Sequence, residues 1–116
     1  MELHVLHAWD LVEELAEVLS ARGMAKGVPA ESEVAELVAR RLADDVARLL
    51  PDGHRAAVRC RAVQAHAVPT LVDAAAEAEL VVLGPHGRGR LASALLGSVT
   101  LACVQQSPCP VVVVHG

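Results

Sequence analysis

The chain has 116 residues, of which 53% are hydrophobic, and its formal net charge is −4. A chain of this length can bury one core of its own, and its composition is too apolar for an intrinsically disordered protein. The single aromatic residue, Trp9, and the acidic balance exclude the stacking platforms and basic faces that bind nucleic acids. We therefore predict a single domain over residues 1–116 with no nucleic-acid partner.

The sequence also bears on membranes and on the cellular compartment. No apolar run approaches the ~20 residues that a membrane-spanning helix needs, so we expect no membrane partner. The opening residues lack the basic and apolar regions of a secretory signal. Three cysteines in or beside apolar stretches suggest buried thiols in a reducing compartment: Cys60, Cys103 and Cys109. These features predict a cytoplasmic protein.

The chain opens with a strand and a helix. Residues 3–8 form a short, apolar and β-prone run. Asp10, followed three residues later by Glu13, is a capping-box pair and predicts a helix over residues 11–22. Gly23 ends that helix.

A longer helix and a second strand follow. Pro29 predicts the start of a helix that continues to about Leu49, because apolar residues recur there at helical spacing. Residues 55–63 read as a strand in which Arg59 and Arg61 alternate with apolar residues. This alternation is typical of a strand at or near a sheet edge.

The second half of the chain repeats the alternation of helix and strand. We predict a helix over residues 69–79, a strand covered on both faces at 80–83, a helix at 98–106 and a last strand at 111–114. Strands separated by helices predict right-handed crossovers and a parallel sheet. The expected fold is therefore a three-layer α/β/α, Rossmann-like arrangement with about four strands in a mostly parallel sheet.

The glycine-rich segment after residues 80–83 carries the chemistry. It leaves the carboxyl end of a predicted strand, where ligands bind in open α/β sheets, and it reaches a helix N-terminus at Ser98. Small residues let backbone N–H groups approach an anion, and the helix end supplies unpaired donors and partial positive charge. The Ser98 hydroxyl and the charge of Arg88 or Arg90 add to these donors. The segment is suited to a phosphate chain.

Two known phosphate motifs fit this segment poorly. Gly84 and Gly89 have the spacing of a P-loop, but Arg90 and Leu91 stand where the motif requires Lys and Ser or Thr. The run from Gly87 to Ala92 formally matches a dinucleotide fingerprint. That fingerprint belongs at the first strand-to-helix turn and needs an acidic residue ~20 positions later, which this chain lacks.

A third pattern fits. Gly84, two residues, Gly87, nine residues and then Gly97-Ser98 resembles the ATP-binding motif of the universal stress protein family. The surrounding segments are similar to the same family as well. Residues 3–10 resemble its second strand and the following loop, residues 80–84 its fourth strand, residues 95–99 its phosphate-binding turn, and residues 107–114 the lead into its fifth strand.

The resemblance implies a ligand, a set of contact residues and an assembly. It implies ATP or another adenine nucleotide as ligand, possibly with Mg²⁺, and a regulatory role in stress response. It also implies a homodimer through the last strand, Val111–Val114. The residues that it assigns to ligand binding, with Ala8 beside the adenine, are Ala8, Gly84, Gly87, Arg88, Gly97, Ser98 and Val99. The alternative is a dimeric interaction module of the same fold that no longer binds nucleotide.

The sequence also departs from that family. Family members begin with a strand and helix ahead of the segment matching residues 3–10, and that first strand, central in the sheet, ends in an acidic adenosine contact. We expect this chain to lack both. Unpaired buried backbone groups are costly, so we expect residues 3–8 to pair directly with residues 80–84. No hydrolytic motif and no metal site is recognisable, so we predict no catalytic residues and weak ATP hydrolysis at most.

Overall fold

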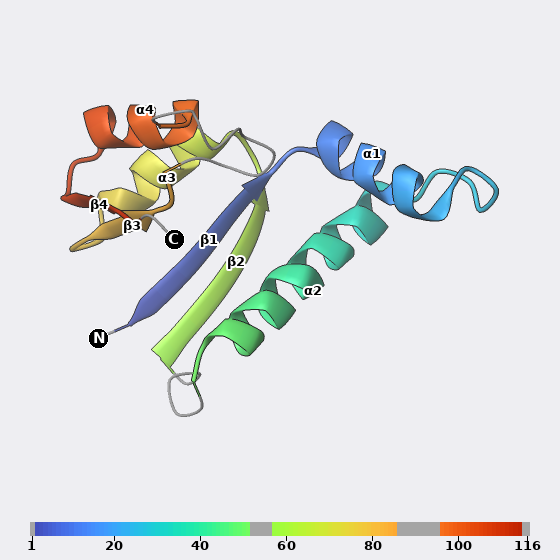
Figure 1. Ribbon diagram of the computed structural model, residues 1–116, viewed down its shortest axis with the longest axis horizontal. Coiled ribbons are helices and arrows are strands. Elements are labelled where there is room, and N and C mark those ends of the chain that lie inside the picture. Colours follow the sequence, from blue (N-terminus) through green and yellow to red (C-terminus); the bar gives the residue numbers. More distant parts are fainter. Residues whose placement is uncertain (1, 52–56, 86–95, 115–116) are drawn as a thin grey trace. The chain divides into compact units, whose positions relative to one another are not determined.

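The computed structural model describes residues 2–51, 57–85 and 96–114 in two compact units, Met1–His66 and Ala67–Gly116. The first unit contains β1 (Leu3–Trp9), α1 (Leu11–Arg22), α2 (Glu31–Leu49) and β2 (Val58–Gln64) (Figure 1). The second contains α3 (Ala67–Ala75), β3 (Val81–Leu83), α4 (Ser98–Gln106) and β4 (Val111–Val113). Helices alternate with parallel strands, so the predicted α/β class is confirmed.

The strands of the first unit form a parallel pair. β1 and β2 align from Leu3 opposite Val58 to Trp9 opposite Gln64. Parallel neighbours need a crossover connection, which α1 and α2 supply, and α2 runs beside β2 in Figure 1. Arg59 and Arg61 are exposed, as expected for an edge strand.

Helix α1 has the bounds that its capping box predicts. The Asp10 carboxylate accepts a hydrogen bond from the Glu13 N–H at 3.1 Å, which satisfies one of the unpaired donors of the first turn. At the other end, Gly23 has a φ of 77°, a conformation that favours glycine, and its N–H donates to the Leu19 carbonyl at 2.8 Å. Both ends are therefore specified by local sequence.

Helix α2 begins later than predicted, at Glu31 rather than at Pro29. Ala30 is extended, with φ −66° and ψ 153°, and its carbonyl accepts from the Glu33 and Val34 N–H groups. Proline fixes φ near −65°, which suits the extended segment before a helix as well as the first turn. Pro29 thus marks the approach to the helix, and Ala30 is the N-cap.

The core of the first unit lies between the strands and the helices. Its buried residues are Trp9, Val34 and Val38, packed against Leu11, Leu15, Ala35 and Ala62. Helix α1 also buries an acid: Glu14 is 5% exposed and accepts a hydrogen bond from Arg41 on α2. A buried carboxylate needs such a partner, so this ion pair joins the two helices.

The second unit is built on another parallel pair. β3 and β4 align from Val81 opposite Val111 to Leu83 opposite Val113, and α4 packs on α3 and on β4. Helix α4 has the predicted bounds, whereas α3 begins at Ala67 instead of Pro69. A proline is tolerated anywhere in a first turn, because the N–H that it lacks has no partner in the helix there.

One face of the β3–β4 pair is open, which corrects the prediction of a strand covered on both faces. Val82 is 58% exposed, and Val112, its partner in register, is 43% exposed. Leu80, two residues before Val82, and Val114, two residues after Val112, are exposed too. Residues two apart share a face, so these four side chains form one apolar stripe, while Val81, Leu83, Val111 and Val113 are half-buried.

The four expected strands form two parallel pairs, one in each unit. The ladder predicted between residues 3–8 and 80–84 would join the two units, and it stays a prediction. Among the described residues, no helix is long and apolar enough to cross a membrane.

Candidate functional site

The turn that leaves β3 is held against the first turn of α4 by two hydrogen bonds. The Thr100 hydroxyl donates to the Gly84 carbonyl at 2.8 Å. The Gly97 N–H donates to the Pro85 carbonyl at 2.7 Å. Two consecutive carbonyls after the strand therefore bind two positions at the start of the helix, and this pair of contacts is called the β3–α4 latch below.

The preceding carbonyl ties the same turn to the last strand. The Leu83 carbonyl accepts from the Val114 N–H at 2.8 Å, and at the other end of the pair the Val81 N–H donates to the Pro110 carbonyl at 3.0 Å. Residues 83, 84 and 85 each accept one hydrogen bond, the first from the end of β4 and the next two from α4. The carboxyl end of β3 and the N-terminus of α4 thus form one connected structure.

The N-terminus of α4 has no capping hydrogen bond from a side chain. Its N-cap is Gly97, which has no side chain to cap the helix, and the first helical bond runs from the Leu101 N–H to the Gly97 carbonyl at 3.0 Å. The N–H groups of residues 98–100 come before that bond and have no acceptor within the helix. No acidic residue lies in the first turn. These donors and the helix dipole together favour a negatively charged ligand.

The predicted contact residues of the second unit lie in this structure. Gly84 is exposed after β3, Gly97 is buried at the N-cap, Ser98 is exposed at the first helical position, and Val99 is half-buried beside it. The latch brings Gly84 and Gly97 to the same turn. Gly97 has φ −70° and ψ 161°, angles that any residue can adopt, so the backbone conformation does not require glycine. Gly97 is buried, so a glycine is suited to this position because it has no side chain to accommodate.

The other predicted contacts are placed differently. Ala8 belongs to the first unit, where it is half-buried in β1 opposite Val63. Gly87 and Arg88 lie outside the described residues. The roles of these three residues stay predictions.

Thr100 is the residue of this turn that the sequence analysis missed. It is 5% exposed, and its hydroxyl makes the latch bond to Gly84. The available signal was a lone hydroxyl within the otherwise apolar run from Val99 to Val104. A buried hydroxyl in such a run needs an acceptor, although the sequence does not reveal which one.

The three cysteines differ in burial. Cys103 is buried, and desolvation raises the pKa of its thiol. Cys109 is half-buried beyond the carboxyl end of α4, where its N–H donates to the Ser107 hydroxyl oxygen at 3.2 Å. Cys60 is exposed on β2, so the prediction of a buried thiol is wrong there.

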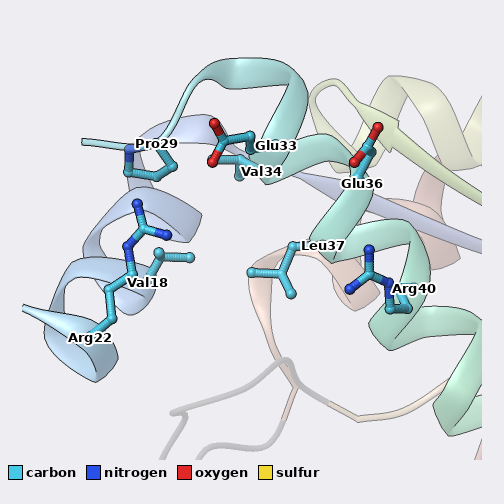
Figure 2. Close-up of a pocket in the computed structure, with 8 residues that line it drawn as sticks. All are labelled: Val18, Arg22, Pro29, Glu33, Val34, Glu36, Leu37 and Arg40. Atoms are coloured by element: carbon cyan, nitrogen blue, oxygen red, sulfur yellow. The ribbon is translucent and has the colours of Figure 1, made fainter. Parts of the chain in front are cut away.

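A hollow between α1 and α2 is a second place to consider for a ligand. Its volume is about 230 Å³, and Figure 2 shows Leu37 on α2 pointing toward α1, where Val18 and Arg22 lie. Two arginines and two glutamates are among the lining residues, which are Val18, Arg22, Pro29, Glu33, Val34, Glu36, Leu37 and Arg40. This balance of charge gives the hollow no preference for an anion. Across the described ranges, no group of three or more metal-ligating side chains occurs.

Comparison with known proteins identifies a family. The sequence profile described as the universal stress protein family matches residues 1–115. Universal stress protein Rv2005c of Mycobacterium tuberculosis is 56% identical over 48 residues, which cover 41% of this chain and 16% of that protein. Universal stress protein Rv2623 of the same organism is 40% identical over 80 residues, which cover 66% of this chain and 27% of that protein.

A solved structure has a similar fold. The hypothetical protein MJ0577, whose structure was described as an assignment of biochemical function, superposes with a TM-score of 0.69 at 22% sequence identity. The match covers 99% of this chain and 76% of that one. At this identity the likeness concerns the fold alone. The chain spans less than a third of the length of each of the two mycobacterial relatives.

Proposed function

The chain belongs to the universal stress protein family, and on that premise we propose that it binds ATP or another adenine nucleotide and acts as a regulatory domain in stress response. The phosphates bind at the turn between β3 and α4, through Gly84, Gly97, Ser98 and Val99. Gly87 and Arg88 complete the phosphate site, and Ala8 lies beside the adenine.

One observation carries this proposal: the latch holds an uncapped helix N-terminus at the carboxyl end of a parallel strand. A phosphate there meets the N–H groups of the first turn, the Ser98 hydroxyl and the positive end of the helix dipole. Because no acid lies in the first turn, nothing in α4 itself opposes the ligand's charge. The family membership and the spacing of the glycines support a nucleotide as the source of that phosphate.

The proposal is tested by titrating the protein with ATP and Mg²⁺ in a calorimeter. Gly97 is buried at the N-cap, so Gly97→Val places a branched side chain where the phosphates are to approach, and we expect binding to be lost. Ala102→Val, also on α4, is the control for added volume, and we expect it to bind normally. An absence of heat at millimolar nucleotide with the wild-type protein, or equal binding by Gly97→Val, would reject the proposal.

The apolar stripe of Leu80, Val82, Val112 and Val114 favours a second candidate function, a dimeric interaction module. An exposed apolar patch of this kind commonly marks a surface that a partner covers. The partner proposed here is a second copy of the chain, paired through Val111–Val114. Light scattering checks the dimer, and the ultraviolet spectrum after acid precipitation checks for copurified nucleotide. A dimer free of nucleotide that also fails to bind ATP would favour this candidate over the first.

A further inference from the structure

The latch contains one bond that depends on a side chain. Thr100 is 5% exposed, and its hydroxyl donates to the Gly84 carbonyl at 2.8 Å. Burial removes water as an alternative partner, so the hydroxyl keeps this acceptor as long as the unit is folded. The other latch bond, from Gly97 to Pro85, joins backbone groups and is available to any residue at position 97.

The two bonds have a joint geometric effect. A single hydrogen bond between a turn and a helix leaves the turn free to rotate about it. Here adjacent carbonyls, those of Gly84 and Pro85, bind groups three residues apart at the start of α4. Two anchors of this kind fix both the distance and the direction of the turn relative to the first turn of the helix. The Leu83 carbonyl ties the turn to the last strand, so without the Thr100 bond the Pro85 bond would be the one remaining latch bond between the turn and α4, and the orientation of Gly84 relative to the helix would be less restricted.

We propose that Thr100 is a positioning residue of the nucleotide site, holding Gly84 against the N-terminus of α4 so that both parts of the site meet one phosphate chain. This inference rests on the proposed function. Thr100 itself makes no bond to the ligand through its hydroxyl, because that hydroxyl is committed to Gly84. It acts by ordering the turn before the ligand arrives, so that binding does not bear the entropic cost of ordering it.

The experiment compares three variants by ATP titration and by amide hydrogen exchange without nucleotide. Thr100→Val keeps the branched shape and removes the hydroxyl, and we expect it to bind ATP about tenfold more weakly. The Gly97 amide should also exchange about tenfold faster, because the neighbouring latch bond loses its support. Thr100→Ser restores the hydroxyl, and we expect its affinity to stay within about twofold of wild type.

Thr70→Val is the matched control. Thr70 is the only other threonine of the chain, lies on α3 in the same unit, and is engaged in an interaction of its own. The same substitution there removes a hydroxyl without touching the latch, so we expect unchanged ATP affinity and an unchanged Gly97 exchange rate. Urea unfolding of all three variants shows how much of any change reflects general destabilisation.

The outcomes separate this inference from the proposed function. If wild type binds ATP and Thr100→Val binds equally well, the positioning role is wrong and the nucleotide site stands. An equal loss of affinity in Thr100→Val and Thr100→Ser would also overturn it, since the hydroxyl would then not be the cause. If wild type does not bind ATP at all, the proposed function fails, and the positioning role fails with it, even where Gly97 exchange is accelerated.

Discussion

Helices α1 and α4 both begin after a strand of a parallel pair, yet their N-termini are chemically opposite. In α1, the Asp10 carboxylate accepts a hydrogen bond from the Glu13 N–H, and Glu13 and Glu14 add negative charge to the first turn. In α4, the N-cap is Gly97 and the first turn contains no acid. The helix N-terminus that follows a strand thus carries acidic side chains in its first turn in α1 and none in its first turn in α4.

This difference shows how to choose between strand-to-helix turns that look alike. A carboxyl end of a strand and a helix N-terminus are both present at α1, but the positive end of that helix is already compensated. Helix α4 combines a first turn without acids with the Gly97-Ser98 step of the motif. First-turn acids therefore distinguish the N-terminus of α1 from that of α4.

The largest effect is expected when an acidic residue is placed in the first turn of α4, because this makes its N-terminus resemble that of α1. Ser98→Asp places a negative charge beside the bound phosphates, and one charge pair at ~6 Å and an effective dielectric constant near 20 is worth about 3 kcal/mol. We expect ATP affinity to fall about a hundredfold, as measured by calorimetry. The control is Ser32→Asp, an exposed serine in the first turn of α2, which should leave ATP affinity unchanged. Equal affinity of Ser98→Asp and wild type would mean that the phosphates bind elsewhere.

A second test removes the buried acid from the first turn of α1. Glu14→Ala takes away a charge-assisted hydrogen bond to Arg41, and we expect the free energy of unfolding to fall by about 2 kcal/mol in urea denaturation. Glu17 contacts the same arginine at 3.6 Å but is half exposed, so Glu17→Ala should cost less than about 1 kcal/mol. ATP affinity should not change in either variant. A cost for Glu17→Ala as large as that for Glu14→Ala would show that burial of Glu14 does not matter.

The smallest expected effect concerns the α1 cap. Asp10→Ala removes the acceptor of the Glu13 N–H and should lower the free energy of unfolding by about 1 kcal/mol. Asp10→Asn keeps an acceptor oxygen, so it should retain most of the stability. If the two variants are equally destabilised, the charge of Asp10 and not its hydrogen bond supports the helix start. Urea denaturation distinguishes these results.

Features of the fold that depend on neighbouring residues were predictable from the sequence. The capping box gives α1 its bounds, and the Gly-Ser step gives the start of α4. Prolines were less informative, because Pro29 precedes its helix and Pro69 lies inside one. The apolar run at residues 80–83 was assigned the wrong environment: its composition suits burial on both faces, but the covering of a face is decided by distant elements.

In the candidate site, too, the features set by sequence spacing were predictable, whereas those that depend on the packing of distant segments were not. The spacing of Gly84 and Gly97 indicated a shared turn, and the latch joins them. The bond of Thr100 was not predictable, because residues 84 and 100 meet only once α4 has packed beside β3. The ligand contacts assigned to Ala8, Gly87 and Arg88 stay predictions.

The carbonyls of residues 83–85 have a consequence for how this turn tolerates mutation. All three hydrogen bonds are accepted by backbone oxygens, which every amino acid supplies. Side chains at these three positions can therefore vary without removing an acceptor, and on the donor side only position 100 requires a particular functional group. In a library of variants selected for folding and nucleotide binding, we expect positions 83 and 85 to diversify while position 100 stays restricted to threonine and serine.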